Sequence, residues 1–207
     1  LHTAYRRQRQ MCIRDRSTCE MVAEILQYIV DKPKLKNIEA DAMYSGILVD
    51  TDNFVIKAGV RTFEAAAFLR RAGADVTRVR KMFREDMEHC RIRTAIINKA
   101  EIYMNEFAIS TFDGANVSGA TVVGAKAANA LLNIQGIRGS FVLTSLQDCI
   151  YISARSIDEL NVQVIMEKFN GGGHLTMAAA QLKDVTLEEA KQQLEDVLQQ
   201  MREDGDI

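Results

Sequence analysis

The chain has 207 residues, of which 47% are hydrophobic and 26% are charged, and its formal net charge is −2. This length allows a sizeable core in one large or two small domains, and the composition is that of a globular protein. No apolar run approaches the ~20 residues of a membrane-spanning helix, and no signal-peptide pattern is present. The four cysteines are scattered, with no CxxC pair. They support neither a disulfide framework nor a zinc site and favour a reducing, cytoplasmic setting.

Residues 1–16 differ in composition from the rest of the chain. They hold five arginines against one aspartate and show no apolar period. Residues 11–16 resemble a translated sequencing-library adapter, so we expect the segment to be foreign to the native protein; the alternative is a basic arm that binds nucleic acid. Without it the chain has 21 basic and 27 acidic residues. This acidic balance argues against binding of DNA or long RNA.

The next part of the chain is predicted to be helical. Ser17 and Glu20 have the spacing of a capping box, and the apolar pattern behind them reaches about Val30, before Pro33. A buried second helix is expected over residues 38–49.

That second helix would lead into Asp50 and Asp52. A carboxylate at a helix C-terminus is unfavourable without a cation, because it lies at the negative end of the helix dipole. From spacing alone, both aspartates are more typical of a solvated turn than of a metal site.

Three more helices are expected before a domain boundary at about residue 106. Thr62 can cap one that runs to about Ala72, Asp75 can cap the next, and a helical pattern continues over residues 88–104. No proline- or glycine-rich linker marks the boundary, so we expect a semi-rigid connection.

The remaining residues alternate between strands and helices, which predicts a small α/β domain. The expected elements are strands at 107–112, 140–145 and 149–156, helices at 120–132 and 162–169, and a final helix capped by Thr186 and Glu189. Period two places Tyr151, Ser153 and Arg155 on one face of the third strand.

Three glycines and a histidine follow the short helix. Gly171, Gly172 and Gly173 allow positive φ and let backbone N–H groups converge on one acceptor, and His174 can donate to a phosphate or base. The alternative is a helix C-terminus followed by a capped surface histidine. With the arginine strand nearby, the residues favour the two interpretations about equally.

Two separate motifs resemble a known family. Residues 149–181 carry Arg155-Ser156, Asn161-Val162, Gly171 to His174 and Ala178 to Ala180, and resemble the end of a DHHA1 domain, the substrate-binding partner of DHH-family phosphoesterases. Residues 46–54 and 61–65 are similar to the last motif of the DHH domain, in which an aspartate, here Asp50, is a metal ligand. The particular variants resemble the bacterial cyclic-di-AMP phosphodiesterases, over about residues 17–200.

The resemblance implies an architecture and an activity. The fold would be α/β: the C-terminal helical part of a DHH domain over 17–105, then a DHHA1 domain with a mixed sheet over 106–207. The activity would be hydrolysis of a 3′,5′-phosphodiester in cyclic di-AMP to linear pApA. Two divalent ions, manganese in this family, would activate the attacking water.

The resemblance also implies roles for particular residues. Asp50 would be catalytic as a metal ligand. Arg155, Ser156, Gly171, Gly172, Gly173 and His174 would hold the nucleotide and its phosphates, and His174 would also stabilise charge on the phosphate under attack.

The chain departs from the family pattern in ways that limit these expectations. The other metal motifs have no counterpart, and His2 and His89 match none of them. We therefore expect an N-terminally truncated chain that does not hydrolyse by itself and is a cytoplasmic part of a membrane-anchored protein, with a homodimer as a further possibility. Met177 stands where a polar residue is expected, which puts base preference in question.

Three alternatives stay open. DHH oligoribonucleases and 3′-phosphoadenosine phosphatases share the glycine–histidine motif. DHHA1-like domains also occur beside alanyl-tRNA synthetases, so an RNA-binding module is a second reading, which the acidic native charge opposes. The third is a regulatory remnant without a ligand.

Overall fold

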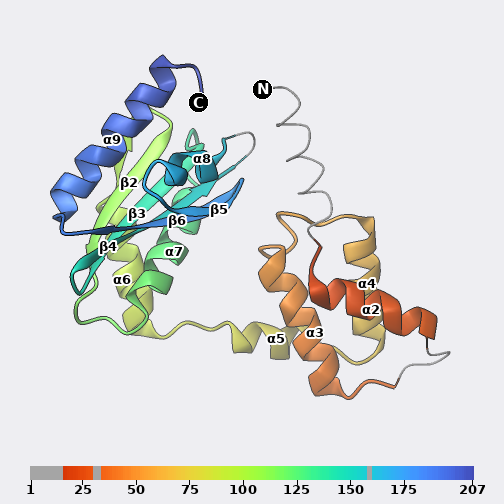
Figure 1. Ribbon diagram of the computed structural model, residues 1–207. Helices are drawn as coiled ribbons and strands as arrows, with labels where there is room; N and C mark the ends of the chain where they lie inside the picture. The colour runs from red at the N-terminus through yellow and green to blue at the C-terminus, as the bar shows by residue number, and fades with distance from the viewer. Residues whose placement is uncertain (1–15, 30–33, 158–159) are drawn as a thin grey trace. The chain divides into compact units, whose positions relative to one another are not determined.

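A computed structural model describes residues 16–29, 34–157 and 160–207 (Figure 1). The chain divides into two compact units, one ending at Arg84 and the other beginning at Glu85. The second unit thus begins well before the boundary expected near residue 106. The reason is that helix α6 (Met87–Asn98) packs against α7 (Ala120–Leu131) and strand β2 (Phe107–Asp113) of the second unit.

The first unit is helical among its described residues. It contains α2 (Thr18–Ile29), α3 (Asn37–Asp50), α4 (Val60–Arg71) and α5 (Val76–Met82). Its core is built around the buried Tyr44, Ile47 and Leu69. The helices α2 and α3 approach closely at Gly46, where a Cβ would lie 2.4 Å from Cys19 Sγ. The small residue at this position is therefore required by packing.

The helix starts follow the predicted capping only in part. Asp75 caps α5 as expected, accepting from the Arg78 amide at 2.8 Å. The capping box at Ser17 is wrong: within the described part of the chain, Ser17 Oγ is buried and makes no hydrogen bond. Glu20 instead accepts from Thr62 Oγ1 at 3.0 Å. Thr62 does not begin α4 but lies in its first turn, where its hydroxyl accepts from the Gly59 amide.

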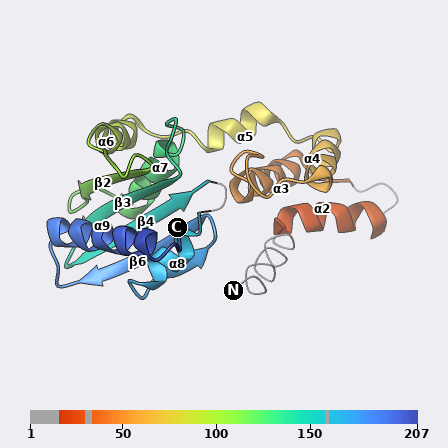
Figure 2. The same ribbon diagram turned by 90° about the horizontal axis from the view of Figure 1, so that it is seen from above.

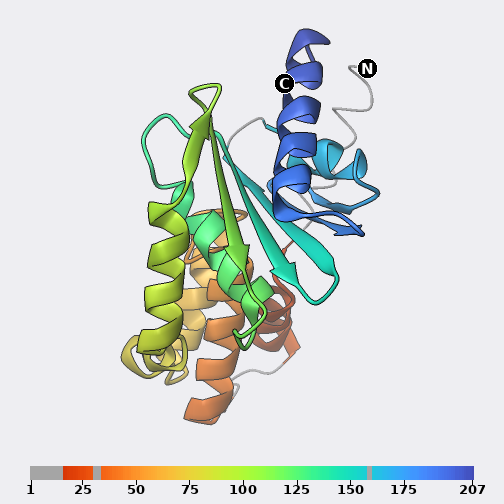
Figure 3. The same cartoon turned by 90° about the vertical axis from the view of Figure 1, so that its left-hand side faces the viewer.

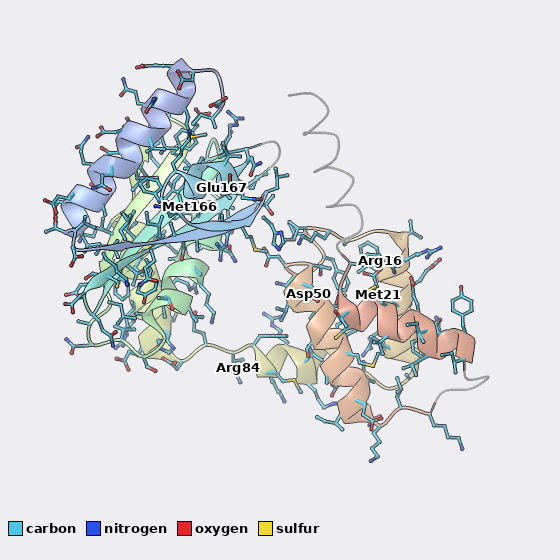
Figure 4. All side chains as sticks on the ribbon, in the orientation of Figure 1. Arg16, Met21, Asp50, Arg84, Met166 and Glu167 are labelled. Atoms are coloured by element: carbon cyan, nitrogen blue, oxygen red, sulfur yellow. The ribbon has the colours of Figure 1, made fainter. Side chains whose placement is uncertain are left out.

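The first helix also exposes the apolar face that the sequence pattern predicted. Ala23 is fully buried, whereas Met21, Ile25 and Ile29 are 40%, 52% and 76% exposed. Met21, which lies on this exposed face, is labelled in Figure 4. The helix is thus confirmed, but most of its predicted apolar face is exposed, and the core contact is made by Ala23 with Cys19 and Leu26 beside it.

The described residues of the second unit form a six-stranded sheet in the order β1-β2-β3-β4-β6-β5. Its strands are β1 (Glu101–Tyr103), β2 (Phe107–Asp113), β3 (Gly139–Leu146), β4 (Cys149–Ser156), β5 (Gly172–His174) and β6 (Met177–Lys183). Strands β2 and β3 are parallel and joined through α7, and the other neighbours are antiparallel. The predicted α/β class with a mixed sheet is confirmed.

Helices cover both faces of this sheet (Figures 2 and 3). On one face, α8 (Val162–Glu167) and α9 (Leu187–Glu203) bury a core that includes Phe141, Ile152 and Leu194. On the other face, α6 and α7 bury a second core that includes Val123 and Val142. The period-two alternation predicted for β4 is confirmed, because Ile150, Ile152 and Ala154 all lie in the first core.

The predicted helix over 88–104 is wrong in its last turn. The helix α6 ends at Asn98, and Glu101–Tyr103 pairs with β2 as the antiparallel strand β1. Met104 and Asn105 have φ of 51° and 61°, and the Glu106 amide donates to Tyr103 O at 3.2 Å. Two successive residues with positive φ make the type I′ turn that a tight hairpin favours, and this turn overrides the helical period.

Candidate functional site

The short helix α8 ends in a main-chain cap formed by the residues that precede the glycines. Asn170 has φ of 55° and its amide donates to Glu167 O, while the Gly171 amide donates to Met166 O at 2.9 Å. Met166 and Glu167 are labelled in Figure 4. This paired arrangement is a Schellman cap. The Gly171 amide is therefore used by the helix, and the expectation that the glycine amides converge on one acceptor is wrong for this residue.

The glycines also belong to a strand rather than to an irregular loop. Gly172, Gly173 and His174 form β5 and pair with Ala179, Ala178 and Met177 of β6. A Cβ at Gly171 would lie 2.3 Å from Ala179 O, and one at Gly173 would lie 2.4 Å from Met177 O. These two glycines are needed so that β5 can approach β6.

Gly172 is different, because packing does not require a glycine there. A Cβ at Gly172 would meet nothing within 4 Å, and the residue is exposed. Its missing side chain leaves the backbone accessible from the open side of the sheet. Such a position suits close approach of a ligand rather than of the protein itself.

The strand register brings predicted site residues onto one face. His174 lies opposite Met177, and Met177 lies opposite Arg155 on β4. Directly opposed residues of antiparallel strands point their side chains to the same face. We call His174, Met177 and Arg155 the histidine row. The His174 side chain is exposed and makes no hydrogen bond within the described part of the chain.

The face that carries this row is the one on which α7 lies. The helix α7 packs on β3 and β4, and Ser140, opposite Arg155, donates from Oγ to Ala128 O at 2.7 Å. Beyond the helix, Ala179 and Gln181 of β6 are exposed on the same face. The sheet therefore offers an accessible surface over β6 and β5, which we call the open face.

Arg155 is held at the border between α7 and the open face. Its Nε donates to Asn129 Oδ1 at 2.8 Å and its Nη1 donates to Ala154 O at 2.8 Å. Asn129 is not among the site residues predicted from the sequence. In the sequence, Asn129 stands out as a polar residue within the alanine-rich stretch that forms α7, the helix that packs on the strand carrying Arg155.

Ser156 is placed differently from its predicted role. Its hydroxyl is buried and donates to Leu160 O at 2.7 Å, with a longer contact to Leu175 O. The Ser156 amide donates to Thr176 O. The residue thus fastens β4 to the segments on either side of α8, and the geometry does not bring its side chain onto the open face.

Asp50 belongs to the first unit, where it is the last residue of α3 and is exposed (Figure 4). Its carboxylate has no hydrogen bond or ion pair within the described residues. Burial, and secondarily the charge of Asp50, raises the pKa of the Cys19 thiol. Asp52 has φ of 43° and lies in the turn that follows, as expected.

The described residues do not by themselves form a metal centre. No group of three or more histidine, cysteine, aspartate or glutamate side chains is close enough to hold an ion in that part of the chain. A divalent ion takes about six donors, and Asp50 supplies one carboxylate. Metal binding at Asp50 therefore stays a prediction that needs donors from elsewhere. The exposed Arg61, which adjoins this motif, places its Nη1 3.9 Å from Oε2 of the half-buried Glu24.

Comparison with protein families assigns the second half of the chain. Residues 107–203 match the DHHA1 domain family. This part of the chain is a DHHA1 domain. The open face, with its histidine row, thus lies on the sheet of the DHHA1 domain.

Most of the chain matches longer bacterial proteins. It is 46% identical over 179 residues to the cyclic-di-AMP phosphodiesterase PdeA of Listeria monocytogenes, covering 86% of this chain and 27% of that protein. It is 44% identical over 190 residues to the cyclic-di-AMP phosphodiesterase GdpP of Geobacillus thermodenitrificans, covering 91% and 29%. The chain therefore spans less than a third of the length of these relatives.

The fold also matches a solved structure. An exopolyphosphatase-related protein from Bacteroides fragilis has a TM-score of 0.79 and 21% identity, over 89% of this chain and 56% of that chain. This likeness shows the fold of the helical unit and the DHHA1 domain. Within the described residues, no helix has the length and apolarity needed to cross a membrane.

Proposed function

We propose that this chain is the nucleotide-recognition part of a cyclic-di-AMP phosphodiesterase, and that the open face of its DHHA1 domain binds the nucleotide. The observation that carries this proposal is the histidine row: His174 and Arg155 share one sheet face with the bare backbone of Gly172 beside them. The names of the two bacterial relatives support the choice of substrate.

The chemistry of the row suits a phosphate. A guanidinium offers several N–H donors in a plane, and an imidazole offers one more. Hydrogen bonds from such groups to phosphate oxygens are among the stronger ones in proteins. Asn129 and the Ala154 carbonyl fix the Arg155 side chain at Nε and Nη1, which lowers the entropy lost when the guanidinium binds a ligand.

In the intact enzyme, His174 would also stabilise the negative charge that develops on the phosphate under attack. Asp50 would supply one ligand to a pair of divalent ions, for which manganese remains the expectation. When bound, such ions lower the pKa of a coordinated water and polarise the phosphate. Because the described residues lack a complete ligand set, we expect the 207-residue chain to bind nucleotide without hydrolysing it.

Isothermal titration of the chain with pApA, cyclic di-AMP and pAp tests the recognition part. We expect binding of at least one adenine dinucleotide, weakened about tenfold or more in His174→Ala and in Arg155→Ala, as expected for loss of a hydrogen bond to a charged group. Lys168→Ala is the matched control. It removes one exposed positive charge at the end of α8, which covers the other face of the sheet.

Other outcomes discriminate among the alternatives. A chain that binds none of the three ligands would refute recognition by the DHHA1 domain. Tighter binding of pAp than of either dinucleotide would favour a phosphoadenosine phosphatase. Binding to long RNA that falls steeply with salt would favour an RNA-binding module.

A further inference from the structure

The open face continues beyond the histidine row in the direction of the other ends of β4 and β6. The next set of opposed residues is Gly172, Ala179 and Ser153, which we call the glycine row. The row carries only the small side chains of Ala179 and Ser153. Gly172 and Ala179 are exposed, and a Cβ at Gly172 would point into open space. The glycine row therefore forms a flat surface without large projecting side chains, which we call the floor.

A third set of opposed residues limits this floor on the far side. Tyr151 of β4 and Gln181 of β6 are register partners, and Gln181 Nε2 lies 3.4 Å from Tyr151 Oη. Successive rows are two residues apart along a strand, or about 7 Å. The floor is thus bounded by Met177 on one side and by Gln181 on the other, with room between them for one planar ring.

The spacing of the rows also fits the shape of a nucleotide. A phosphate held at His174 and Arg155 would place its attached base roughly one row away, over the glycine row. A flat ring can stack on such a surface because no side chain projects from Gly172 and only a methyl group projects from Ala179. The thioether of Met177 adds a polarisable contact beside the ring.

Gln181 has the hydrogen-bonding groups to read such a base. It is exposed, and its contact of 3.4 Å with Tyr151 is long for a hydrogen bond, so most of the capacity of the amide remains available to a ligand. A glutamine amide offers one acceptor and a donor side by side, which matches the amino group and N7 of adenine. Guanine presents two acceptors at the same edge, and the amide oxygen would then face one of them.

We propose that the glycine row is a nucleobase platform and that Gln181 selects adenine over guanine. This inference rests on the proposed function, since it requires a nucleotide phosphate at the histidine row. It also answers the question that Met177 raised about base preference: the polar group that contacts the base is the amide of Gln181, four positions and two rows further along β6 on the same face.

The test compares binding of pApA and pGpG by the full 207-residue chain and by Gln181→Met, which keeps the length of the side chain and removes its amide. We expect the unsubstituted chain to prefer pApA by about tenfold, the discrimination of a good paired contact to a base. Gln181→Met should bring the two affinities together, mainly by weakening pApA. Gln200→Met is the control, an exposed glutamine on α9, which lies over the opposite face.

The outcomes separate this inference from the proposed function. Binding of both dinucleotides without a preference, or a preference that survives in Gln181→Met, overturns the platform and leaves phosphate recognition intact. Binding of neither dinucleotide by the unsubstituted chain overturns the proposed function, and the base inference falls with it. A preference that is lost in Gln181→Met but kept in Gln200→Met supports both.

Discussion

Replacing each of the three glycines by alanine separates the requirements of packing from those of the ligand. At Gly171 the new methyl group would lie 2.3 Å from Ala179 O and 2.7 Å from Ala180 Cβ. At Gly173 it would lie 2.4 Å from Met177 O, on a residue whose φ of 153° is unusual for alanine. At Gly172 it would enter open space. The three variants carry the same chemical change and differ only in surroundings.

The expected magnitudes follow from these contacts. Distances below 3 Å to main-chain atoms cannot be relieved by side-chain rotation, so β5 must move away from β6. Overpacking of this kind costs about 1–3 kcal/mol, and the backbone conformation of Gly173 adds about 1–3 kcal/mol. Because β5 is the last strand of the sheet, it can detach locally, which limits the loss of global stability. At Gly172 alanine should leave stability unchanged or raise it by about 0.5 kcal/mol.

Two measurements check the series. Amide hydrogen exchange should show lost protection in β5 and β6 for Gly171→Ala and Gly173→Ala, and unchanged protection for Gly172→Ala. Titration with pApA should show weaker binding in all three, because in Gly172→Ala the methyl group occupies the space assigned to the ligand. If Gly172→Ala lost as much protection as Gly171→Ala, or kept full affinity, the division of roles among the glycines would be wrong.

Two further predictions concern stability. Thr144 and Ser140 are fully buried on β3, but Ser140 Oγ donates to Ala128 O, whereas Thr144 Oγ1 has no hydrogen bond within the described residues. Urea denaturation should therefore show Thr144→Val to be neutral or stabilising by about 1 kcal/mol and Ser140→Ala to be destabilising by about 1 kcal/mol, and equal effects would contradict this accounting. In the first unit, the Arg78 guanidinium, together with the Asp75 amide, holds the pKa of Asp41 below its usual range. A depressed pKa contributes stability above the unfolded value of about 3.9 that is lost as pH falls through the folded pKa. Asp41→Asn should thus lower the melting temperature at pH 7, and the effect should shrink as the pH falls below about 3.9 and through the folded-state pKa; a pH-independent effect would rule out the ion pair as the cause.

Local patterns predicted much of the DHHA1 domain. The strands around Phe141 and Ile152 are runs of β-branched and aromatic residues, and the caps at Asp75 and Thr186 form as their sequences indicate. Strand β6 was missed because it begins Met-Ala-Ala-Ala, and alanine has a low preference for strands. It is a strand because it fills the place between β4 and the glycines of β5, where larger side chains could not approach.

The residues of the candidate site also fall into two groups: those that the sequence motifs select and those that only the tertiary structure brings together. His174, Arg155 and the glycines are selected by the family motif; their own chemistry allows phosphate binding but does not by itself distinguish it from a helix C-terminus and a surface histidine, and their role in binding stays a prediction. Ser156 was selected by the same motif, yet its hydroxyl is used to bond main-chain carbonyls on either side of α8. Asn129 lies far from the motif in sequence. Gln181 is the last residue of the matched stretch but carries no role in the motif. Only the strand register and the position of α7 bring these two residues to the same face.

The α/β class, most of the helices, the three central strands and the candidate phosphate-binding residues can therefore be predicted from the amino-acid sequence alone. These follow from the spacing of apolar residues and from motifs, which are properties of neighbouring positions. Only the folded sheet shows which of those residues share a face, which glycine faces open space, and that Gln181 lies one row beyond the glycine row. These depend on strand register, in which a shift of one residue would turn His174 and Gln181 to the opposite face of the sheet.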